Sequence, residues 1–428
     1  MRKPMHKKEA PTYLKHVHAF SRNARFFLAS TIFFGFMYGL YSLFFNLYIL
    51  GLGYDQELLG VLASIPSLVT AIVAIPVGVL LPRIGYKRSL LVGTLFQMLA
   101  LLGWVFLPEK ATLTLASALF GLGTSLIRIS SSPFMVASST QRERTHLFSI
   151  QFGLNTLAGV LASLIGGVLP RMLAFLFNLP LEGATTYRGT LLVAGALCAV
   201  SLLPLAAIRN RTAAPKTDTQ VGGIQQYHPI MGKLVLTELT ISLGAGLLMP
   251  FVNVFYKLRF SLPDHVLGGL FAASSLTMGL AVMLVPLCVK RMGKVKTIVL
   301  TQVLSLPFLF LMGFSPIFTL SAGSYLMRTA LMNMSAPVLT AFAMGIVPAP
   351  LRPITSSLLV LSWNGGWAIS AYASGKLQVR TGFSPIFLIT GSLYLLSALL
   401  IYRLFHRTRE IEETTIAEAA LVDEEIKP

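Results

Sequence analysis

The feature that most constrains this chain is a succession of long apolar runs separated by short polar turns. The 428-residue sequence is 54% hydrophobic and only 12% charged, about half the charged share of an average soluble protein. A helix needs about 20 residues to cross the hydrocarbon core of a bilayer, and in lipid it must satisfy its own backbone hydrogen bonds. The sequence therefore predicts twelve membrane-spanning helices, at 26–50, 57–81, 89–107, 112–137, 147–170, 188–208, 234–256, 265–289, 297–314, 318–343, 354–375 and 384–405.

The basic residues are distributed unevenly around these runs. A net charge of +18 would suggest nucleic-acid binding in a soluble protein, but here Lys and Arg flank the spans, and we expect no nucleic-acid partner. If the N-terminus is cytoplasmic, the inner segments carry 25 Lys or Arg and the outer segments carry 7. The positive-inside rule then predicts a multi-pass protein of the inner (plasma) membrane with both termini in the cytoplasm.

A polar interruption divides the spans six and six. The predicted segments are a basic cytoplasmic N-terminal tail (1–25), a six-helix half (26–208), a cytoplasmic linker (209–233), a second six-helix half (234–405) and an acidic cytoplasmic tail (406–428). The two halves align with each other at a nearly constant offset. The matching positions are Asn46 with Asn253 at an offset of 207, and Gly60 with Gly268, Arg83 with Arg291, Gly85 with Gly293 and Arg144 with Arg352 at 208. Amide, basic and Gly positions repeated in this way indicate an internal duplication.

A compact basic turn, "GVLLPRIGYKRS", separates the second and third spans. Its Gly permits a tight turn between two long helices, and its basic residues lie where anionic lipid headgroups would attract them. A looser copy, "VPLCVKRMGKVKT", stands between the eighth and ninth spans. The candidate conformational residues of the two copies are Gly78, Arg83, Gly85, Lys87, Arg291 and Gly293.

With this turn in both halves, the chain resembles a transporter of the major facilitator superfamily over residues 26–405. The resemblance implies an all-α integral membrane fold of twelve transmembrane helices, arranged as two six-helix pseudo-symmetric halves around a site that opens alternately to each side. In the family, this loop carries an acid that is thought to bind a helix N-terminus of the other half and latch the inner side shut. Pro82 stands in the acid's place, so we expect the inner side to close less firmly than in relatives.

Three ionisable side chains fall inside the predicted spans, where charge is costly and a function is the default expectation. The resemblance implies that the fourth and tenth spans line the cavity, which makes Arg128 and Arg328 candidate anchors for an anionic or polar substrate. The alternative is that each Arg bonds backbone carbonyls and ties helices together. Glu238 is a candidate proton-coupling carboxylate, and alternatively it snorkels to the interface or pairs with a loop cation such as Lys233.

Aromatic and amide side chains supply further candidate binding residues. They recur at helical spacing on the first span and cluster on the eleventh, although such stripes also serve as packing. With so few charges nearby, the pattern favours a hydrophobic or amphipathic substrate. The candidates are Tyr38, Tyr41, Asn46, Asn253, Trp363, Asn364 and Trp367.

The function expected from the sequence is transport, not catalysis. We expect a secondary active or facilitative transporter that moves a small organic solute by alternating access, with efflux of amphipathic compounds first and uptake or exchange of an anionic metabolite second. A sensor or lipid scramblase on the same fold is the alternative of another class. We expect a monomer surrounded by membrane lipids, with no cofactor. We also expect no metal site, because Cys198 and Cys288 both lie within spans.

Overall fold

The structure is a computed structural model that describes residues 20–181, 183–209, 224–348 and 351–408. The predicted acidic tail, most of the basic tail and most of the linker lie outside these residues. Every regular element in the described chain is a helix. The helices of the first half are α2 (Arg22–Gly51), α3 (Gln56–Ile84), α4 (Tyr86–Phe106), α5 (Lys110–Ala137), α6 (Gln141–Phe177) and α7 (Ala184–Ala207).

The second half repeats this series, with one interruption. Its seventh span is broken by a single 3-10 turn that contains Pro250, whose ring removes a backbone donor from the helix. The first helix of this half begins at Ile224, inside the predicted linker. The elements are α8 (Ile224–Leu248), η1 (Met249–Phe251), α9 (Val252–Phe260), α10 (Asp264–Met292), α11 (Lys294–Phe314), α12 (Phe318–Gly345), α13 (Arg352–Thr381) and α14 (Ser384–Phe405).

All twelve predicted spans correspond to helical segments. Within the described residues, ten segments are long and apolar enough to cross a membrane, and α8, η1 and α9 together form one of them. The other two, α12 and α13, are more polar, with Arg328 inside α12 and Lys376 near the end of α13. The twelve-helix membrane fold is thus confirmed, and the two polar helices are ones that pack against other helices along much of their length.

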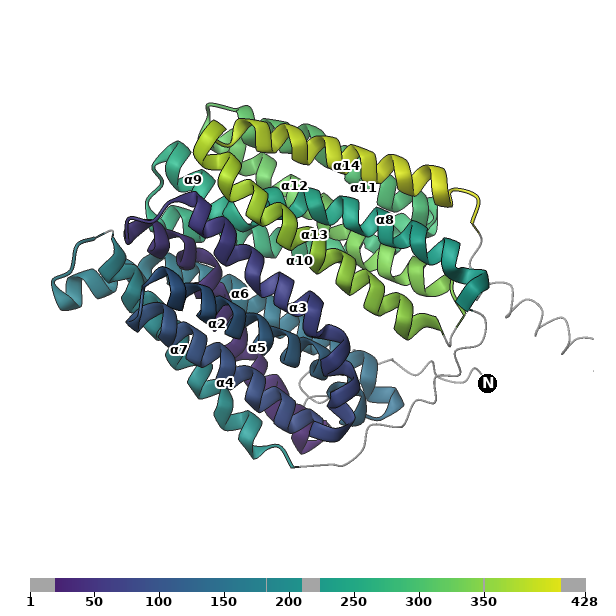
Figure 1. The fold of residues 1–428 in the computed structure, drawn as a ribbon, viewed down its shortest axis with the longest axis horizontal. Coiled ribbons are helices and arrows are strands. Elements are labelled where there is room, and N and C mark those ends of the chain that lie inside the picture. The colour runs from purple at the N-terminus through teal and green to yellow at the C-terminus, as the bar shows by residue number, and fades with distance from the viewer. Residues whose placement is uncertain (1–19, 182, 210–223, 349–350, 409–428) are drawn as a thin grey trace, which may run out of the picture.

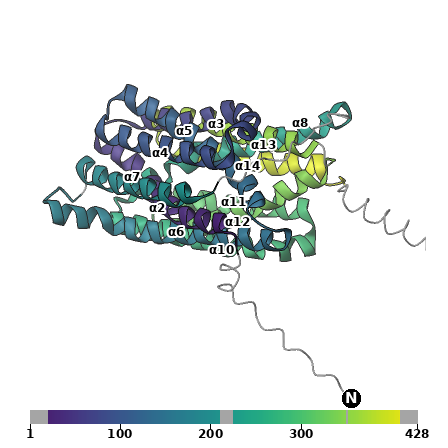
Figure 2. The same ribbon diagram turned by 90° about the horizontal axis from the view of Figure 1, so that it is seen from below.

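The two halves lie side by side (Figure 1), the first coloured purple to teal and the second green to yellow. Across the boundary α3 packs along α13 and α6 packs along α10, and α2 touches α9. The helices α4, α7, α11 and α14 pack mainly against helices of their own half. Figure 1 shows α4 and α7 on the side of the first half that lies away from the second, and in the view from below they lie in front (Figure 2). Four helices therefore carry most of the contact between the halves.

The halves share a hydrophobic core at one end of the bundle only. The largest core cluster contains residues of both halves, such as Phe44 and Phe251. We call the end where α2 stops and α3 begins, and where this cluster lies, the closed end. Near the opposite end, each half has its own core, around Phe134 in the first half and around Phe342 and Phe405 in the second. We call this end, where α3 stops and α4 begins, the open end.

Two equivalent glycines make the turns of the open end. Gly85 has φ +83° between α3 and α4, and Gly293 has φ +78° between α10 and α11. A residue with a β-carbon would be strained in this left-handed conformation. Nearby, the backbone N–H of Thr140 donates to Glu143 Oε2 over 3.1 Å at the start of α6, and this bond holds the pKa of the Glu143 carboxyl below its usual value.

Candidate functional site

At the closed end the two halves meet backbone to backbone at two glycine pairs. A β-carbon on Gly375 of α13 would lie 2.7 Å from the Cα of Gly60 in α3. A β-carbon on Gly268 of α10 would likewise lie 2.7 Å from the Cα of Gly167 in α6. Both pairs follow the duplication, because Gly60 corresponds to Gly268 and Gly167 to Gly375 at the offset of 208. The internal repeat thus builds the same contact twice, once on each side of the boundary.

Between the two glycine pairs, Asn46 and Asn253 bind each other. Asn46 Nδ2 donates to Asn253 Oδ1 over 2.9 Å and to the backbone oxygen of Pro250 over 2.6 Å. In return Asn253 Nδ2 donates over 3.0 Å to the oxygen of Leu43, which is the equivalent of Pro250 at the offset of 207. The Pro250 oxygen is accessible to Asn46 because the Val254 N–H donates to the Asn253 side chain instead. The matching Asn positions therefore pair with one another across the halves.

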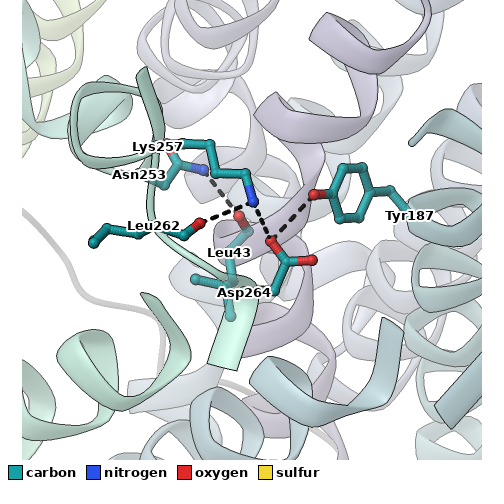
Figure 3. Close-up of polar contacts among 6 residues, drawn as sticks. All are labelled: Leu43, Tyr187, Asn253, Lys257, Leu262 and Asp264. Carbon is teal, nitrogen blue, oxygen red and sulfur yellow. Dashed lines mark hydrogen bonds and ion pairs between the residues drawn. The ribbon is translucent and has the colours of Figure 1, made fainter. Parts of the chain in front are cut away.

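A polar network lies beside this pair, shown in Figure 3. Asp264 Oδ1, at the start of α10, accepts a hydrogen bond of 2.9 Å from Lys257 Nζ and one of 3.1 Å from the Tyr187 hydroxyl. Lys257 Nζ also donates to the oxygen of Leu262 over 2.9 Å. Tyr187 belongs to the first half, whereas Lys257 and Asp264 belong to the second, so the Tyr187–Asp264 bond bridges the halves.

Sequence reasoning missed this network because Asp264 precedes the predicted eighth span by one residue and was counted as a loop residue. In the structure Asp264 is only 7% exposed. A usable signal was present in the sequence, because Lys257 and Asp264, seven residues apart, border one short outer loop. Two opposite charges so near to a membrane are expected to pair.

Toward the open end, α3 and α10 expose apolar side chains. On α3 Ala71 is still buried, but Ile75 is 57% exposed and Val79 is 74% exposed. On α10 Met283 is 74% exposed. Both helices therefore present apolar side chains at this end.

The two tyrosines predicted on the first span have different surroundings. Tyr41 is part of an aromatic cluster and stacks on Trp104 with ring centroids 5.3 Å apart and nearly parallel planes. Tyr38, one turn nearer the open end, is 53% exposed. Tyr38 precedes Ser42 by about one helical turn, and the Ser42 backbone oxygen accepts a hydrogen bond from Asn253. Tyr38 is thus exposed, whereas Tyr41 packs among aromatic rings of the first half.

The three candidates on α13 lie against α8. Ser242 donates its hydroxyl to the backbone oxygen of Trp363. The rings of Trp363 and Trp367 have centroids 5.9 Å apart, and both side chains are half-buried. Asn364 is 6% exposed and donates to the oxygen of Val360 one turn earlier in its own helix. Only the exposed parts of the two tryptophan side chains can contact a solute, and the Asn364 amide is already hydrogen-bonded within its own helix.

The two arginines predicted to face one cavity have opposite environments. Arg128 is exposed, and within the described chain it makes no hydrogen bond or ion pair. Arg328 is 3% exposed. It donates to the Tyr394 hydroxyl and over 2.7 Å to the sulfur of Met249, and its guanidinium lies 5.4 Å from the centroid of the Tyr394 ring. Arg328 ties α12 to α14 and η1, as the alternative interpretation of the sequence allowed, whereas Arg128 remains available.

Glu238 lies deeper in its helix than the sequence suggested. The predicted span began at 234, but α8 begins at Ile224, so several turns of helix precede Glu238. Its side chain is half-buried, and it forms no ion pair with Lys233, which is exposed. Glu238 is thus a carboxyl group within the span and without a paired cation among the described residues.

The residues of the basic turns lie on the surface of the open end. Gly78, Arg83, Arg291 and Gly293 are exposed, and Gly85 and Lys87 are half-buried. The two turn glycines have the positive φ angles expected of them. Asn46 lies near the end of α2 at the closed end, whereas the turns follow the ends of α3 and α10 at the open end. The turns and the amide pair are therefore at opposite ends of the bundle.

Comparison with known proteins agrees with this geometry. A family model described as Major Facilitator Superfamily matches residues 26–232 and 234–424. No curated protein matches the chain. Among solved structures, the nucleoside transporter NupG is similar at 12% identity and a TM-score of 0.71, covering 89% of this chain and 98% of that chain.

Two other solved structures give the same result. A bacterial homologue of the human lysosomal transporter Spinster, in an inward-facing and occupied conformation, is 13% identical with a TM-score of 0.70 and covers 94% of this chain and 98% of its own. A D-xylose–proton symporter is 14% identical with a TM-score of 0.69 and covers 89% and 97%. At such identities these likenesses concern the fold. With a family model that matches nearly the whole chain, this multi-pass membrane protein belongs to the Major Facilitator Superfamily, and it is a secondary transporter of small solutes and not an enzyme.

Proposed function

We propose that this transporter exports amphipathic organic compounds. The observation that carries the proposal is the apolar character of the side chains that α3 and α10 expose toward the open end, with Ile75, Val79 and Met283 each more than half exposed. Burial of apolar solute surface against such side chains is favourable and non-directional, which suits solutes that share amphipathicity more than a common shape.

Polar groups near this surface would orient the solute without selecting for charge. Tyr38 offers an exposed hydroxyl on the first-half side, and the edges of Trp363 and Trp367 offer ring surface on the second-half side. Because Arg328 is buried in the second half and donates to Tyr394 and Met249, its guanidinium is already engaged and does not call for an anionic solute. This composition supports a neutral or weakly charged amphipath.

The proposed direction of transport is based on the orientation of the open end. The excess of basic residues on one side favours a cytoplasmic location for the termini, and with them for the open end. The conformation is then one that receives solute from inside the cell. For coupling we propose Glu238, because an unpaired carboxyl within a span can load and release protons as the halves rearrange.

A binding and transport assay with matched variants tests the proposal. Purified protein is screened by thermal shift against amphipathic and anionic panels, since a ligand of the folded state raises the unfolding temperature. Transport of each hit is then measured in proteoliposomes. We expect amphipathic hits, and we expect Val79→Ser to weaken them severalfold. Phe175→Ser is the control, since Phe175 is 85% exposed but lies at the closed end of α6.

The same assay can overturn the proposal. A panel of hits that is uniformly anionic, or equal loss of binding in Val79→Ser and Phe175→Ser, contradicts amphipath export. For coupling, Glu238→Gln should abolish the dependence of transport on a pH gradient while leaving solute binding intact. Unchanged gradient dependence in this variant removes Glu238 from the coupling step.

A second candidate function rests on Arg128 alone. Its guanidinium is exposed on α5 and unpaired within the described residues, and a guanidinium can bind a carboxylate or phosphate with two parallel hydrogen bonds. This favours uptake or exchange of an anionic metabolite. Arg128→Gln should then abolish transport of anions, whereas under amphipath export it should change transport less than twofold.

A further inference from the structure

The duplication makes the closed end symmetric in its backbone contacts but not in its polar contacts. At the offset of 207 or 208, Lys257 corresponds to Leu50 and Asp264 to Gln56. The helices α7 and α14 begin at 184 and 384, so Tyr187 has its equivalent in Phe387, the fourth residue of α14. None of the three equivalents can reproduce the charged bridge, because they lack the ammonium, the carboxylate and the hydroxyl.

The polar bridge lies on one side of the boundary. Asp264 begins α10, and its backbone oxygen is near Gly167, so the bridge accompanies the α6–α10 glycine pair. The α3–α13 side instead has an ion pair of 3.9 Å between Glu57 and Lys376, whose side chains are 50% and 42% exposed. An ion pair that is so exposed and so long contributes little, whereas a buried hydrogen bond to a charged group is among the stronger ones.

We infer that the closed end is a one-sided gate, in which the Tyr187–Asp264 bond holds the α6–α10 side together while the α3–α13 side opens first. Lys257 is a positioning residue in this gate, because its ammonium fixes the Asp264 carboxylate where the Tyr187 hydroxyl can reach it. When the halves part at this end, Lys257 and Asp264 move together with the second half. The bond from Tyr187 to Asp264 joins the two halves and must break for this side to open.

Such a gate changes how a rearrangement of equivalent halves proceeds. Two equal contacts would separate together, with the halves tilting about an axis midway between them. With one side held, the halves pivot on the α6–α10 side, and the first opening lies between α3 and α13. Removing the Tyr187 hydroxyl takes this hydrogen bond away from the α6–α10 side and gives position 187 the Phe that stands at the equivalent position of α14.

Hydrogen exchange detected by mass spectrometry tests this inference on the full-length protein in lipid nanodiscs. Segments 56–62 and 371–377 report the α3–α13 side, and segments 163–169 and 264–270 report the α6–α10 side. In the wild type we expect the first two segments to exchange faster. Tyr187→Phe should raise exchange in the latter two by about tenfold or more, the change expected for loss of a hydrogen bond to a charged group.

Three variants control this experiment. Tyr48→Phe removes a buried hydroxyl that donates to the oxygen of Trp104 within the first half, and it should leave the comparison between the two sides unchanged. Glu57→Gln should also leave it unchanged. Asp264→Asn keeps an acceptor for Tyr187 but loses the charge that Lys257 holds, and it should raise exchange on the α6–α10 side by less than Tyr187→Phe.

Two results overturn the one-sided gate. The first is equal exchange on both sides in the wild type, which needs no variant and therefore does not depend on the folding of any mutant. The second is a folded Tyr187→Phe protein, with an unfolding temperature like that of Tyr48→Phe, in which exchange on the two sides is unchanged or rises equally. Neither result bears on which solute is carried.

Discussion

The closed and open ends of this transporter are built from the same four helices by different means. At the closed end, α3 meets α13 and α6 meets α10 through glycines, with the backbones in contact. At the open end, α3 and α10 carry Ile75, Val79 and Met283, which are exposed. The difference indicates that small residues let the backbones of the two halves touch at the closed end, whereas larger apolar side chains remain exposed at the open end.

The largest expected effect comes from adding one methyl group to the closed end. A β-carbon on Gly268 would collide with the backbone of α6, including the Cα of Gly167 at 2.7 Å, whereas Gly269 has open space at that position. Gly268→Ala should therefore destabilise the closed end by up to about 3 kcal/mol and reduce transport about tenfold or more. Gly269→Ala is the matched control, and equal transport by the two variants would contradict the backbone contact.

The amide pair should have the next largest effect. Asn46→Ala removes two hydrogen bonds and leaves the Asn253 side chain and the Pro250 oxygen short of a partner, which costs about 2 kcal/mol in the closed state. Asn253→Ala should cost about the same, and the double variant much less than the sum, because both changes break one pair. Hydrogen exchange of segment 42–48, measured in a double-mutant cycle, tests this expectation. Additive losses of protection would contradict the pairing of Asn46 with Asn253.

The arginines extend the comparison to stability. Arg328 donates to the sulfur of Met249, which begins η1, and to the Tyr394 hydroxyl. Removing the Arg328 side chain leaves the buried Tyr394 hydroxyl without this donor. Arg328→Gln should lower the free energy of unfolding by about 1.5 kcal/mol, measured by thermal unfolding in detergent. Arg128→Gln, on an exposed side chain, should change it by less than about 0.5 kcal/mol. A larger loss of unfolding free energy in Arg128→Gln than in Arg328→Gln would contradict the structural role of Arg328.

The smallest expected effect is at the open end. Pro82 lies in the last turn of α3, in the position where the family's loop has an acid. Pro82→Asp should favour closure of this end by about 0.5 kcal/mol, the scale of a carboxylate at a helix N-terminus, or about twofold in population. Cysteine accessibility near Val79 measures the shift. No shift would show that the acid has no partner in the second half.

The spans, the duplication and the matching of Asn46 with Asn253 and of Gly60 with Gly268 could be predicted from the sequence, because length, hydropathy and a repeated offset are visible in one chain. The two Asn residues were predicted to bind substrate, however, and only the structure shows that they bind each other. The face of each helix that meets a neighbour could not, because lipid and protein interior are both apolar and hydropathy does not separate them. That is why Tyr41 and Tyr38 received the same role although only Tyr38 is exposed.

The charged groups were harder to place for a related reason. Arg328 was recognisable as costly, but only the structure shows that Tyr394 and Met249 receive its guanidinium. Glu238 was placed too near the helix end because residues 224–233 are polar enough to resemble a loop. Asp264 was missed because a one-residue error in a boundary separates a loop acid from a buried one.

The pairing of equivalent positions at the closed end makes this surface self-complementary. Asn46 binds its own counterpart, and Gly60 meets Gly375, the counterpart of Gly167 in the same half. Two copies of the first six helices would therefore offer each other the same amide pair and the same two glycine contacts that one chain now makes across its halves. They would lack only the ammonium and carboxylate of Lys257 and Asp264. Fusion into one chain is what allows the two sides of this surface to differ.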